Sequence, residues 1–263
     1  MQNNNILYQN KDGIEYIQFK KLLQYSEITH CYTLRSNNEL NFPPVYKDEE
    51  MLKQSYRKIC NCLNIDSSKI VKPHQTHTDK VEIVNEVKYF DEIDGLLTNQ
   101  KEITLLTTSA DCISLLLYDP EKNVIGSIHS GWKGTLKAII INAIEKMVNE
   151  FESNTQDIIC CICPSIRSCC FEVDEDVKNL FFEEYSYLSN INEIIKQGKI
   201  KENKQKYYID TVKINIELLK NAGLKEENII DSGICTMCHH NKFHSYRVDK
   251  ENSGRNAALI TRC

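Results

Sequence analysis

Hydrophobic and polar positions alternate along the first part of the chain in a way that predicts short strands. Residues 6–9 and 14–19 flank the turn pair Asp12-Gly13, which is typical of a β-hairpin. Residues 48–63 instead carry apolar side chains at three- and four-residue spacing, which predicts a helix. Further strands are expected at 28–34, 70–71 and 81–84, and Asp94-Gly95 is interpreted as a turn signal.

The centre of the chain is dense in strand-forming residues. Residues 103–108, 113–118 and 124–129 predict three strands, and the last of them runs into the glycine turn His129-Ser-Gly-Trp-Lys-Gly-Thr135. Residues 136–151 follow with the clearest helical periodicity in the sequence. His129 is therefore expected at the end of a strand, where α/β proteins commonly place their chemistry.

The second half repeats strands and helices without an obvious linker. Helices are predicted after the N-cap residues Asp174 and Asp210, and residues 189–206 are interpreted as a polar connecting excursion. No segment rich in glycine, proline or serine divides the chain, so we expect one domain over residues 1–263. Strands are expected at 158–163, 170–173, 207–209, 229–234 and 256–260.

Composition narrows the class of protein. The chain of 263 residues is 41% hydrophobic and 26% charged, as expected of a soluble globular protein, and its formal net charge of −5 gives no indication of nucleic-acid binding. No apolar run approaches the roughly 18–20 residues of a membrane span. The N-terminus has no signal-peptide pattern, so we expect a cytoplasmic protein. We also expect a monomer or homodimer without nucleic-acid or membrane partners.

Twelve cysteines without a targeting signal indicate reduced thiols, metal ligands or a nucleophile rather than disulfides. Cys235-Thr-Met-Cys238-His239 matches a haem-attachment spacing, but that attachment belongs outside the cytoplasm. A zinc knuckle of Cys235, Cys238, His239 and His240 is a weak alternative, and a structural loop or buried thiols are favoured. The group Cys160, Cys161, Cys163, Cys169 and Cys170 fits neither common ferredoxin spacing.

Three motifs stand at predicted strand ends: His74-Gln-Thr-His77, Ala110-Asp-Cys112 and the turn that begins at His129. Two histidines and one cysteine suit Zn²⁺, and three protein ligands leave a fourth position open. An open position is what a catalytic zinc needs in order to lower the pKa of bound water. By spacing alone, single histidine and cysteine residues on strands are more often core or surface residues than metal ligands.

An ordered set of motifs closely resembles the YfiH/YlmD-type family, from about Arg35 to the C-terminus. Members of this family have been called laccase-like polyphenol oxidases and, more recently, purine nucleoside phosphorylases and adenosine deaminases. The motifs are His74-Gln-Thr-His77, Asp94-Gly-Leu-Leu-Thr98, Ala110-Asp-Cys112, His129-Ser-Gly-Trp-Lys-Gly-Thr135, Pro164-Ser-Ile, Cys169-Cys-Phe-Glu-Val173, Cys235-Thr-Met-Cys238, Phe243-His-Ser-Tyr-Arg247 and Gly254-Arg255.

The resemblance implies an α+β fold, a four-layer α-β-β-α sandwich with mixed β-sheets. It implies a metal, usually zinc, held by His77, Cys112 and His129, with copper as the alternative. The implied substrates are purine nucleosides and phosphate: phosphorolysis of adenosine, inosine and S-methyl-5′-thioadenosine, and deamination of adenosine. The sequence departs from the family pattern at Asn37-Asn38, Thr78, Lys133 and Cys163, and none of these positions is an implied metal ligand.

Other roles are argued from chemistry. Asp111 is the nearest acid to Cys112 for proton transfer, but in a regular strand the two side chains would point to opposite faces, so a bulge or turn is required. Arg35, Lys133 and Arg247 are candidates for phosphate binding, since cationic side chains bind phosphate and arginine is well shaped for it.

Three alternatives remain at this stage. A copper-dependent polyphenol oxidase would use the same three ligands, although a multicopper enzyme needs more. A metal-free cysteine hydrolase, acting on peptidoglycan-type substrates, would use Cys112 as nucleophile and His129 as base. A non-catalytic zinc protein would need a fourth protein ligand to close the site.

Overall fold

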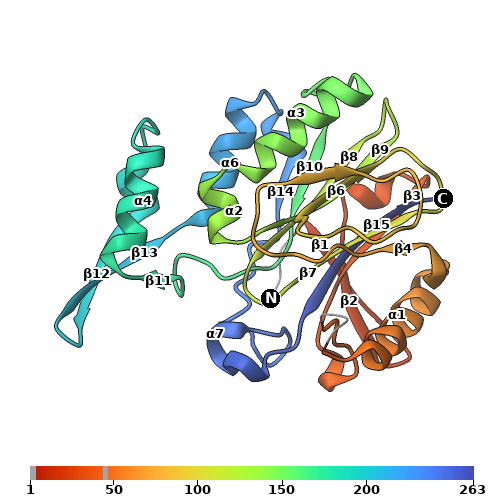
Figure 1. Ribbon diagram of the computed structural model, residues 1–263, viewed down its shortest axis with the longest axis horizontal. Coiled ribbons are helices and arrows are strands. Elements are labelled where there is room, and N and C mark those ends of the chain that lie inside the picture. Colours follow the sequence, from red (N-terminus) through yellow and green to blue (C-terminus); the bar gives the residue numbers. More distant parts are fainter. Residues whose placement is uncertain (1–3, 44–46) are drawn as a thin grey trace.

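The computed structural model describes residues 4–43 and 47–263, and two six-stranded sheets lie at its centre (Figure 1). The strands of the first sheet follow the order β1-β2-β3-β15-β7-β4, and only the pair of β7 and β4 is parallel. These strands are β1 (Ile6–Lys11), β2 (Ile14–Phe19), β3 (Ile28–Thr33), β4 (Ile70–Val71), β7 (Thr104–Ser109) and β15 (Asn256–Arg262).

The second sheet follows the order β14-β10-β8-β9-β6-β5. Its two outer pairs are parallel and its inner pairs are antiparallel, so both sheets are mixed. These strands are β5 (Val81–Ile83), β6 (Gly95–Thr98), β8 (Ile113–Asp119), β9 (Val124–Ser130), β10 (Ile159–Ile162) and β14 (Ile229–Asp231).

Helices cover the outer face of each sheet. The helix α1 (Glu49–Leu63) packs on the first sheet, whereas α2 (Trp132–Leu136), α3 (Ile139–Phe151) and α6 (Thr211–Asn221) pack on the second (Figure 1). A third apolar cluster fills the space between the two sheets. This arrangement confirms the expected α-β-β-α sandwich.

The strand β8 shows how the sequence produces these layers. Its side chains alternate between two clusters: Leu115 and Leu117 pack toward the helices, and Leu116 and Tyr118 pack between the sheets. Because successive residues of a strand point to opposite faces, a strand buried on both sides must be apolar throughout. This requirement explains the continuous hydrophobic run of residues 113–118.

Buried cysteines contribute to the same clusters. Cys60 on α1 and Cys31 on β3 lie in the cluster between that helix and the first sheet, Cys160 lies beneath the opposite helices, and Cys161 and Cys163 lie between the sheets. Burial raises the pKa of each of these thiols above its ordinary value. These five cysteines are therefore core residues.

Residues 172–209 form a smaller unit on one side of the sandwich, at the left of Figure 1. The expected polar connection over residues 189–206 is wrong, because a helix and most of a hairpin occupy it. Glu202 and Asn203 both have positive φ, the pattern of a type I′ hairpin turn, but without the glycine that would have identified it. The elements are β11 (Glu172–Val173), α4 (Glu175–Tyr185), α5 (Ile191–Ile194), β12 (Ile195–Lys201) and β13 (Lys204–Ile209).

The helix expected over residues 136–151 is interrupted. The helix α2 ends at Leu136 and α3 begins at Ile139, with Ala138 in a left-handed conformation at φ 53°. The hydroxyl of Tyr185 donates hydrogen bonds to the carbonyl oxygens of Thr135 and Leu136, at 2.5 and 3.2 Å. A partner 49 residues away thus satisfies the end of α2, which local periodicity cannot reveal.

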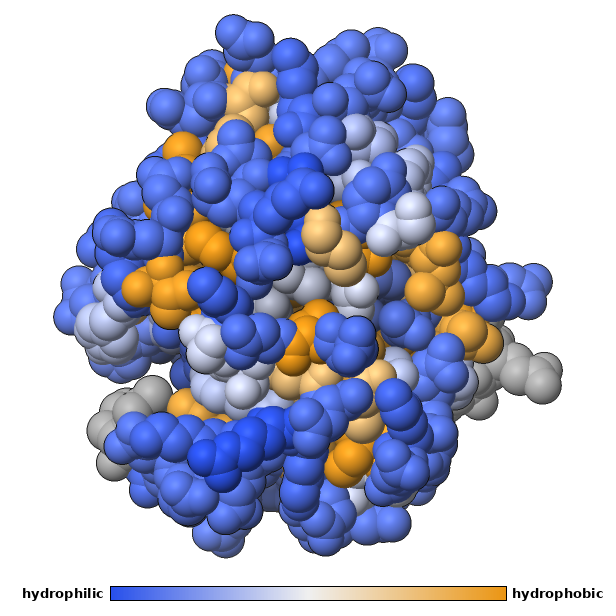
Figure 2. All heavy atoms as spheres, turned by 90° about the vertical axis from the view of Figure 1, so that its right-hand side faces the viewer, coloured by the Kyte–Doolittle hydropathy of each residue, from blue (hydrophilic) through white to orange (hydrophobic). Residues whose placement is uncertain are grey.

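The other predicted elements agree with the structure to within a few residues, apart from Asp94-Gly95, which opens β6 instead of forming a turn. The last helix, α7 (Tyr246–Asp249), is one short turn. Among the described residues, no helix is both long enough and apolar enough to cross a membrane. The face in Figure 2 is mainly hydrophilic, with small and separated apolar patches.

The contact between the two sheets should dominate stability. Leu116→Ala, within the inter-sheet cluster, is expected to lower the free energy of unfolding by about 2–5 kcal/mol, since it removes buried methyl groups and leaves a cavity. Urea denaturation measures the effect. Leu180→Ala on α4 is the control, because that side chain is 45% exposed, and an equal loss in both variants would contradict the layer assignment.

Candidate metal centre and the cavity around it

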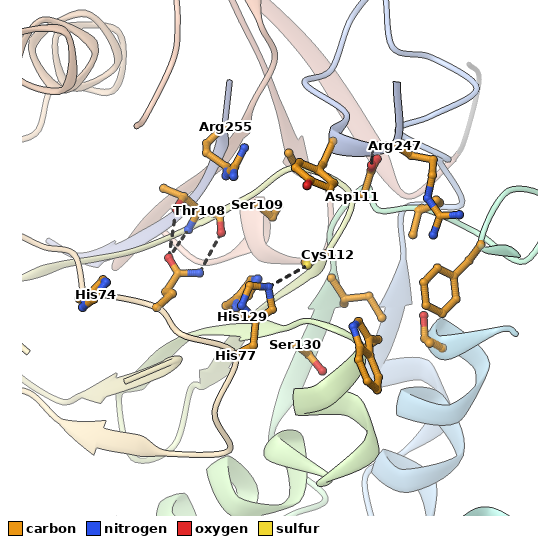
Figure 3. A pocket seen from close by; sticks show the side chains of 18 of the residues that line it. His74, His77, Thr108, Ser109, Asp111, Cys112, His129, Ser130, Arg247 and Arg255 are labelled. Carbon is orange, nitrogen blue, oxygen red and sulfur yellow. Dashed lines mark hydrogen bonds between the residues drawn. The ribbon is translucent and has the colours of Figure 1, made fainter. Parts of the chain in front are cut away.

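The structure brings together His77, Cys112 and His129, which come from three separate segments of the chain (Figure 3). His77 lies in the loop between β4 and β5, Cys112 immediately precedes β8, and His129 lies near the end of β9. Their ligand atoms all lie within 4.8 Å of one another, and Cys112 Sγ is 3.8 Å from His77 Nε2. Two imidazoles and one thiolate form a donor set typical of zinc.

Asp94 holds two of these side chains in place. Its Oδ1 lies 2.7 Å from His129 Nδ1, so the other ring nitrogen of His129 is left for Cys112 and a metal. The same carboxylate accepts the backbone N–H groups of Thr76, His77 and Thr78 and the Thr78 hydroxyl. This carboxylate–histidine contact is the usual support for a histidine ligand.

Asp94 is completely buried and still carries its charge. Burial alone would raise the pKa of this carboxyl, but the hydrogen bonds and the charge of His129, with the donors of Thr78, lower it to about 2. In the sequence, Asp94 stands out only as part of a turn signal and a family motif. One signal in the sequence could have identified Asp94 as important. It is an acidic residue next to a buried strand, and a buried charge requires hydrogen-bonding or ionic partners.

Cys112 and His129 shift each other's titration. Burial raises the pKa of the Cys112 thiol, but the nearby His129 lowers it to about 6. Burial lowers the pKa of His129, but the Cys112 thiolate and Asp94 raise it to about 9. Without a metal the pair is therefore a thiolate and an imidazolium, and the thiolate is the form of cysteine that binds metals and attacks electrophiles.

Gly131 leaves the space that these side chains occupy. A Cβ atom at this position would lie 2.6 Å from His77 Cδ2 and 3.3 Å from Cys112 Sγ. Its φ of −66° is open to any residue, so the glycine serves close approach and not a sharp turn as the sequence indicated. His77 itself has a φ of 63°, an uncommon conformation that the hydrogen bonds to Asp94 maintain.

The three side chains open into a cavity of about 500 Å³, within the usual range for small-molecule sites. Ile166, Phe171 and Trp132 supply apolar parts of its wall, and Thr108 and Ser109 supply polar parts. The cavity is therefore large enough and mixed enough in polarity for a ligand with a flat apolar ring and several hydroxyl groups.

Asp111 lines the same cavity because the chain turns between β7 and β8, where Asp111 has a φ of 81°. The required turn is thus present. Both carboxylate oxygens are already occupied: Oδ1 accepts the Thr236 hydroxyl at 2.7 Å, and Oδ2 accepts the Ser245 hydroxyl and the Arg247 backbone N–H at 3.0 and 2.7 Å. These contacts tie residues 236–247 to the cavity wall.

The three cations named from the sequence lie in different places. Arg247 lines the cavity, where its guanidinium donates to the Glu172 carbonyl and lies over the Phe171 ring. Arg35 lines a separate hollow and bonds to Asn38 and the His240 carbonyl. Lys133 is exposed, beside the Trp132 ring.

Two further cations, Lys72 and Arg255, line the cavity and were not predicted from the sequence. Burial, together with the charge of Arg255, lowers the pKa of Lys72 to about 8. Within residues 4–43 and 47–263, neither side chain has a carboxylate within salt-bridge distance. Arg255 donates instead to the carbonyl oxygens of Ser253 and Gly254. No local pattern distinguishes Lys72 from the other lysines, because only the fold brings it beside Arg255.

Residues 32–263 match the family model described as multi-copper polyphenol oxidoreductase laccase. The chain belongs to this family. The match covers nearly all of the chain, and the YfiH/YlmD-type resemblance inferred from the ordered motifs is thereby confirmed.

Relatives with assigned names span the same region. The chain is 33% identical to purine nucleoside phosphorylase CA_C1699 of Clostridium acetobutylicum, over 95% of this chain and 96% of that protein. It is 30% identical to adenosine deaminase RL5 from an unknown prokaryotic organism, over 76% and 78% of the two chains. It also matches purine nucleoside phosphorylase LACC1 of the mouse at 28% identity over 89% of this chain, but spans only 53% of that protein.

Solved structures show the same fold. The crystal structure of the Bacillus licheniformis hypothetical protein YfiH superimposes with a TM-score of 0.87 and 26% sequence identity. The superposition covers 97% of this chain and 99% of that one.

The buried charge of Asp94 predicts a specific pH dependence. Because the pKa of Asp94 in the folded protein lies below its ordinary value of 3.8, the carboxylate stabilises the fold above that pH and stops doing so as the pH falls through about 2. Asp94→Asn should therefore be less stable than wild type at pH 5, by an amount that shrinks by about 2 kcal/mol toward pH 2.

Urea unfolding in the presence of a chelator measures this difference without any contribution from metal. Asp176→Asn, an exposed carboxylate on α4, is the control. A stability difference between wild type and Asp94→Asn that stays constant with pH would contradict the ionised state of Asp94.

Proposed function

We propose that this chain is a zinc-dependent purine nucleoside enzyme. It would cleave adenosine, inosine and S-methyl-5′-thioadenosine with phosphate, and it would deaminate adenosine. The observation that carries this proposal is the group of His77, Cys112 and His129 at the wall of a 500 Å³ cavity. The names of the relatives, purine nucleoside phosphorylase and adenosine deaminase, support the choice of substrate.

The residues present fit a zinc ion. Three ligand atoms from His77, Cys112 and His129 converge, Cys112 is poised as a thiolate, and the cavity provides an open fourth direction. When bound there, zinc supplies a Lewis-acidic centre that polarises an oxygen atom of water or substrate. The Asp94–His129 contact fixes the ring orientation that such a centre needs.

The protein's own side chains would position the nucleoside. Phe171 and Trp132 offer ring surfaces against which a purine can stack. Thr108 and Ser109 offer hydroxyl groups at the wall between Asp111 and the histidines, suited to ribose hydroxyls (Figure 3). We assign Asp111 a positioning role, because its carboxylate holds Thr236, Ser245 and Arg247 against the cavity.

Phosphorolysis also requires a site for phosphate. Of the cations named from the sequence, only Arg247 lines the cavity, and we add Lys72 and Arg255 to the proposed phosphate-binding set. Two neighbouring cations without a carboxylate partner repel each other, so a bound anion would relieve this repulsion. We place phosphate between Lys72 and Arg255, both of which line the cavity; Arg255 lies near Thr108 in Figure 3.

Copper-dependent oxidation of phenols is the second candidate, favoured by the description of the family model. Two histidines and a cysteine are also ligands that copper accepts. A metal-free cysteine hydrolase is favoured by the thiolate–imidazolium pair of Cys112 and His129. All three candidates use the same residues, so the metal and the products must distinguish them.

Cys112→Ala tests the proposal. Wild-type protein with stoichiometric zinc should convert adenosine and phosphate to adenine and ribose 1-phosphate, and should release ammonia from adenosine. The variant should lose the zinc equivalent of this site, and both activities should fall by at least about 100-fold, since even changes beyond the direct ligands cost 10- to 100-fold. Metal analysis and chromatography of products measure these effects, with half-buried Cys62→Ala on α1 as the control.

Two outcomes would contradict the zinc enzyme. Full activity after complete removal of metal would favour the cysteine nucleophile. Oxidation of phenols restored by copper, without any turnover of nucleosides, would favour the oxidase.

Lys72→Gln tests the phosphate site. Loss of one charged hydrogen-bond donor, worth about 1.5–3 kcal/mol, should raise the KM for phosphate roughly 10- to 100-fold while deamination, which needs no phosphate, stays near the wild-type rate. In wild type the same KM should rise above about pH 8, where Lys72 loses its proton. Lys133→Gln is the matched control, and an equal effect of both substitutions would contradict the assignment.

A further inference from the structure

A second group of thiols lies away from the cavity centre. Cys169 and Cys170 stand between β10 and β11, and Cys235 and Cys238 follow β14, yet their four sulfur atoms all lie within 4.8 Å of one another. The histidines that follow Cys238 do not belong to this group. The pair Cys235 and Cys238 therefore lies against Cys169 and Cys170, which come 65 or more positions earlier in the chain, and not against the histidines that follow it.

The spacing of these sulfur atoms matches a mononuclear metal site. Cys238 Sγ lies 3.7 Å from Cys169 Sγ and 3.5 Å from Cys170 Sγ, and the latter two are 3.6 Å apart. Four thiolates about 2.3 Å from a tetrahedral zinc stand about 3.8 Å from one another. A disulfide would bring two sulfur atoms to about 2.05 Å, so these are four separate thiols.

Contacts other than the cysteines fix the two loops relative to each other. Ser165 and Cys235 form a parallel β-bridge. The guanidinium of Arg167 donates two hydrogen bonds to Asp231, at 2.8 and 2.5 Å, and one to the Ile234 carbonyl at 3.2 Å. The thiols are thus brought together by a scaffold that does not depend on them, which is the condition for a pre-formed site.

The surroundings of Cys235 also suit a bound thiolate. The backbone N–H groups of Cys238 and Arg167 donate hydrogen bonds to its sulfur. Backbone donors to sulfur stabilise the negative charge of metal-bound thiolates. Cys235 is buried, whereas Cys169 and Cys238 are exposed, so an ion could enter from solvent.

We propose that Cys169, Cys170, Cys235 and Cys238 bind a zinc ion as a structural tetrathiolate site. Four protein ligands close the coordination sphere and leave no open position, in contrast to the group around Cys112. Binding releases the thiol protons to solvent, and its free energy adds to the stability of the folded chain. The site shares no residue with the proposed catalytic centre and does not rest on the proposed function.

The role of this site follows from the neighbours of its ligands. Phe171, next to Cys170, forms part of the cavity wall, and Thr236, next to Cys235, donates to Asp111. A metal would therefore join the two loops that hold this side of the cavity, across a separation of 65 residues between Cys170 and Cys235. The metal would stabilise the folded chain by its binding free energy, and, unlike a disulfide, it would persist in a reducing environment.

Zinc content of the purified full-length chain tests the site. Wild type should bind one zinc equivalent more than Cys169→Ser/Cys238→Ser, whose two substitutions lie at exposed positions. The matched control is Cys62→Ser/Cys263→Ser, which should retain the wild-type zinc content. His77→Ala should keep the additional equivalent even if the catalytic proposal fails, so the two proposals are separable.

Two further measurements detect the site, and each gives a result on the wild type alone. Native mass spectrometry should show the zinc adduct of a chain in which all four cysteines are reduced and none forms a disulfide. After replacement by Co²⁺, the thiolate-to-cobalt charge-transfer absorption should reach the strength of four thiolates in addition to that of Cys112, and only the contribution of Cys112 should remain in Cys169→Ser/Cys238→Ser. Equal zinc content in wild type and this variant, a chain lighter by the two hydrogens of a disulfide, or iron in place of zinc would each overturn the proposal.

Discussion

The candidate metal centre depends on one buried carboxylate. Asp94 receives five hydrogen bonds, from three consecutive backbone N–H groups, one hydroxyl and the His129 ring. An ionised carboxylate without such partners could not remain in the interior, and those partners are the segments that carry His77 and His129. The buried charge of Asp94 therefore fixes the geometry of the centre. His77 and His129 occupy their positions because Asp94 requires the hydrogen-bond donors that their segments supply.

The sandwich makes this arrangement accessible to a substrate. The antiparallel pairs β8–β9 and β9–β6 place Cys112, His129 and Asp94 at the same end of three neighbouring strands of the second sheet. Asp111, in the turn between the sheets, fastens the loops that close the opposite wall. Rigid strands thus position the metal ligands, and loops shape the space in which a ligand would lie.

Local patterns in the sequence predicted most of the fold because its strands are short and strongly apolar and its long helices are clearly periodic. They failed where a distant partner decides the local structure, as Tyr185 does at the end of α2, or where a turn lacks its usual residues, as at Glu202 and Asn203. The resemblance to the family named the three side chains that the structure brings together, but spacing alone could not. Asp94, Lys72 and the four-thiol group were missed because their significance lies in contacts across the fold.

The central claim is that His77, Cys112 and His129 hold a metal ion, and anomalous diffraction at the zinc absorption edge from crystals of the zinc-loaded protein tests it most directly. The account predicts an anomalous peak about 2.0–2.3 Å from Cys112 Sγ and from one nitrogen of each histidine, with Asp94 still bonded to His129 Nδ1. Zinc-loaded crystals without a peak among these three side chains would contradict it.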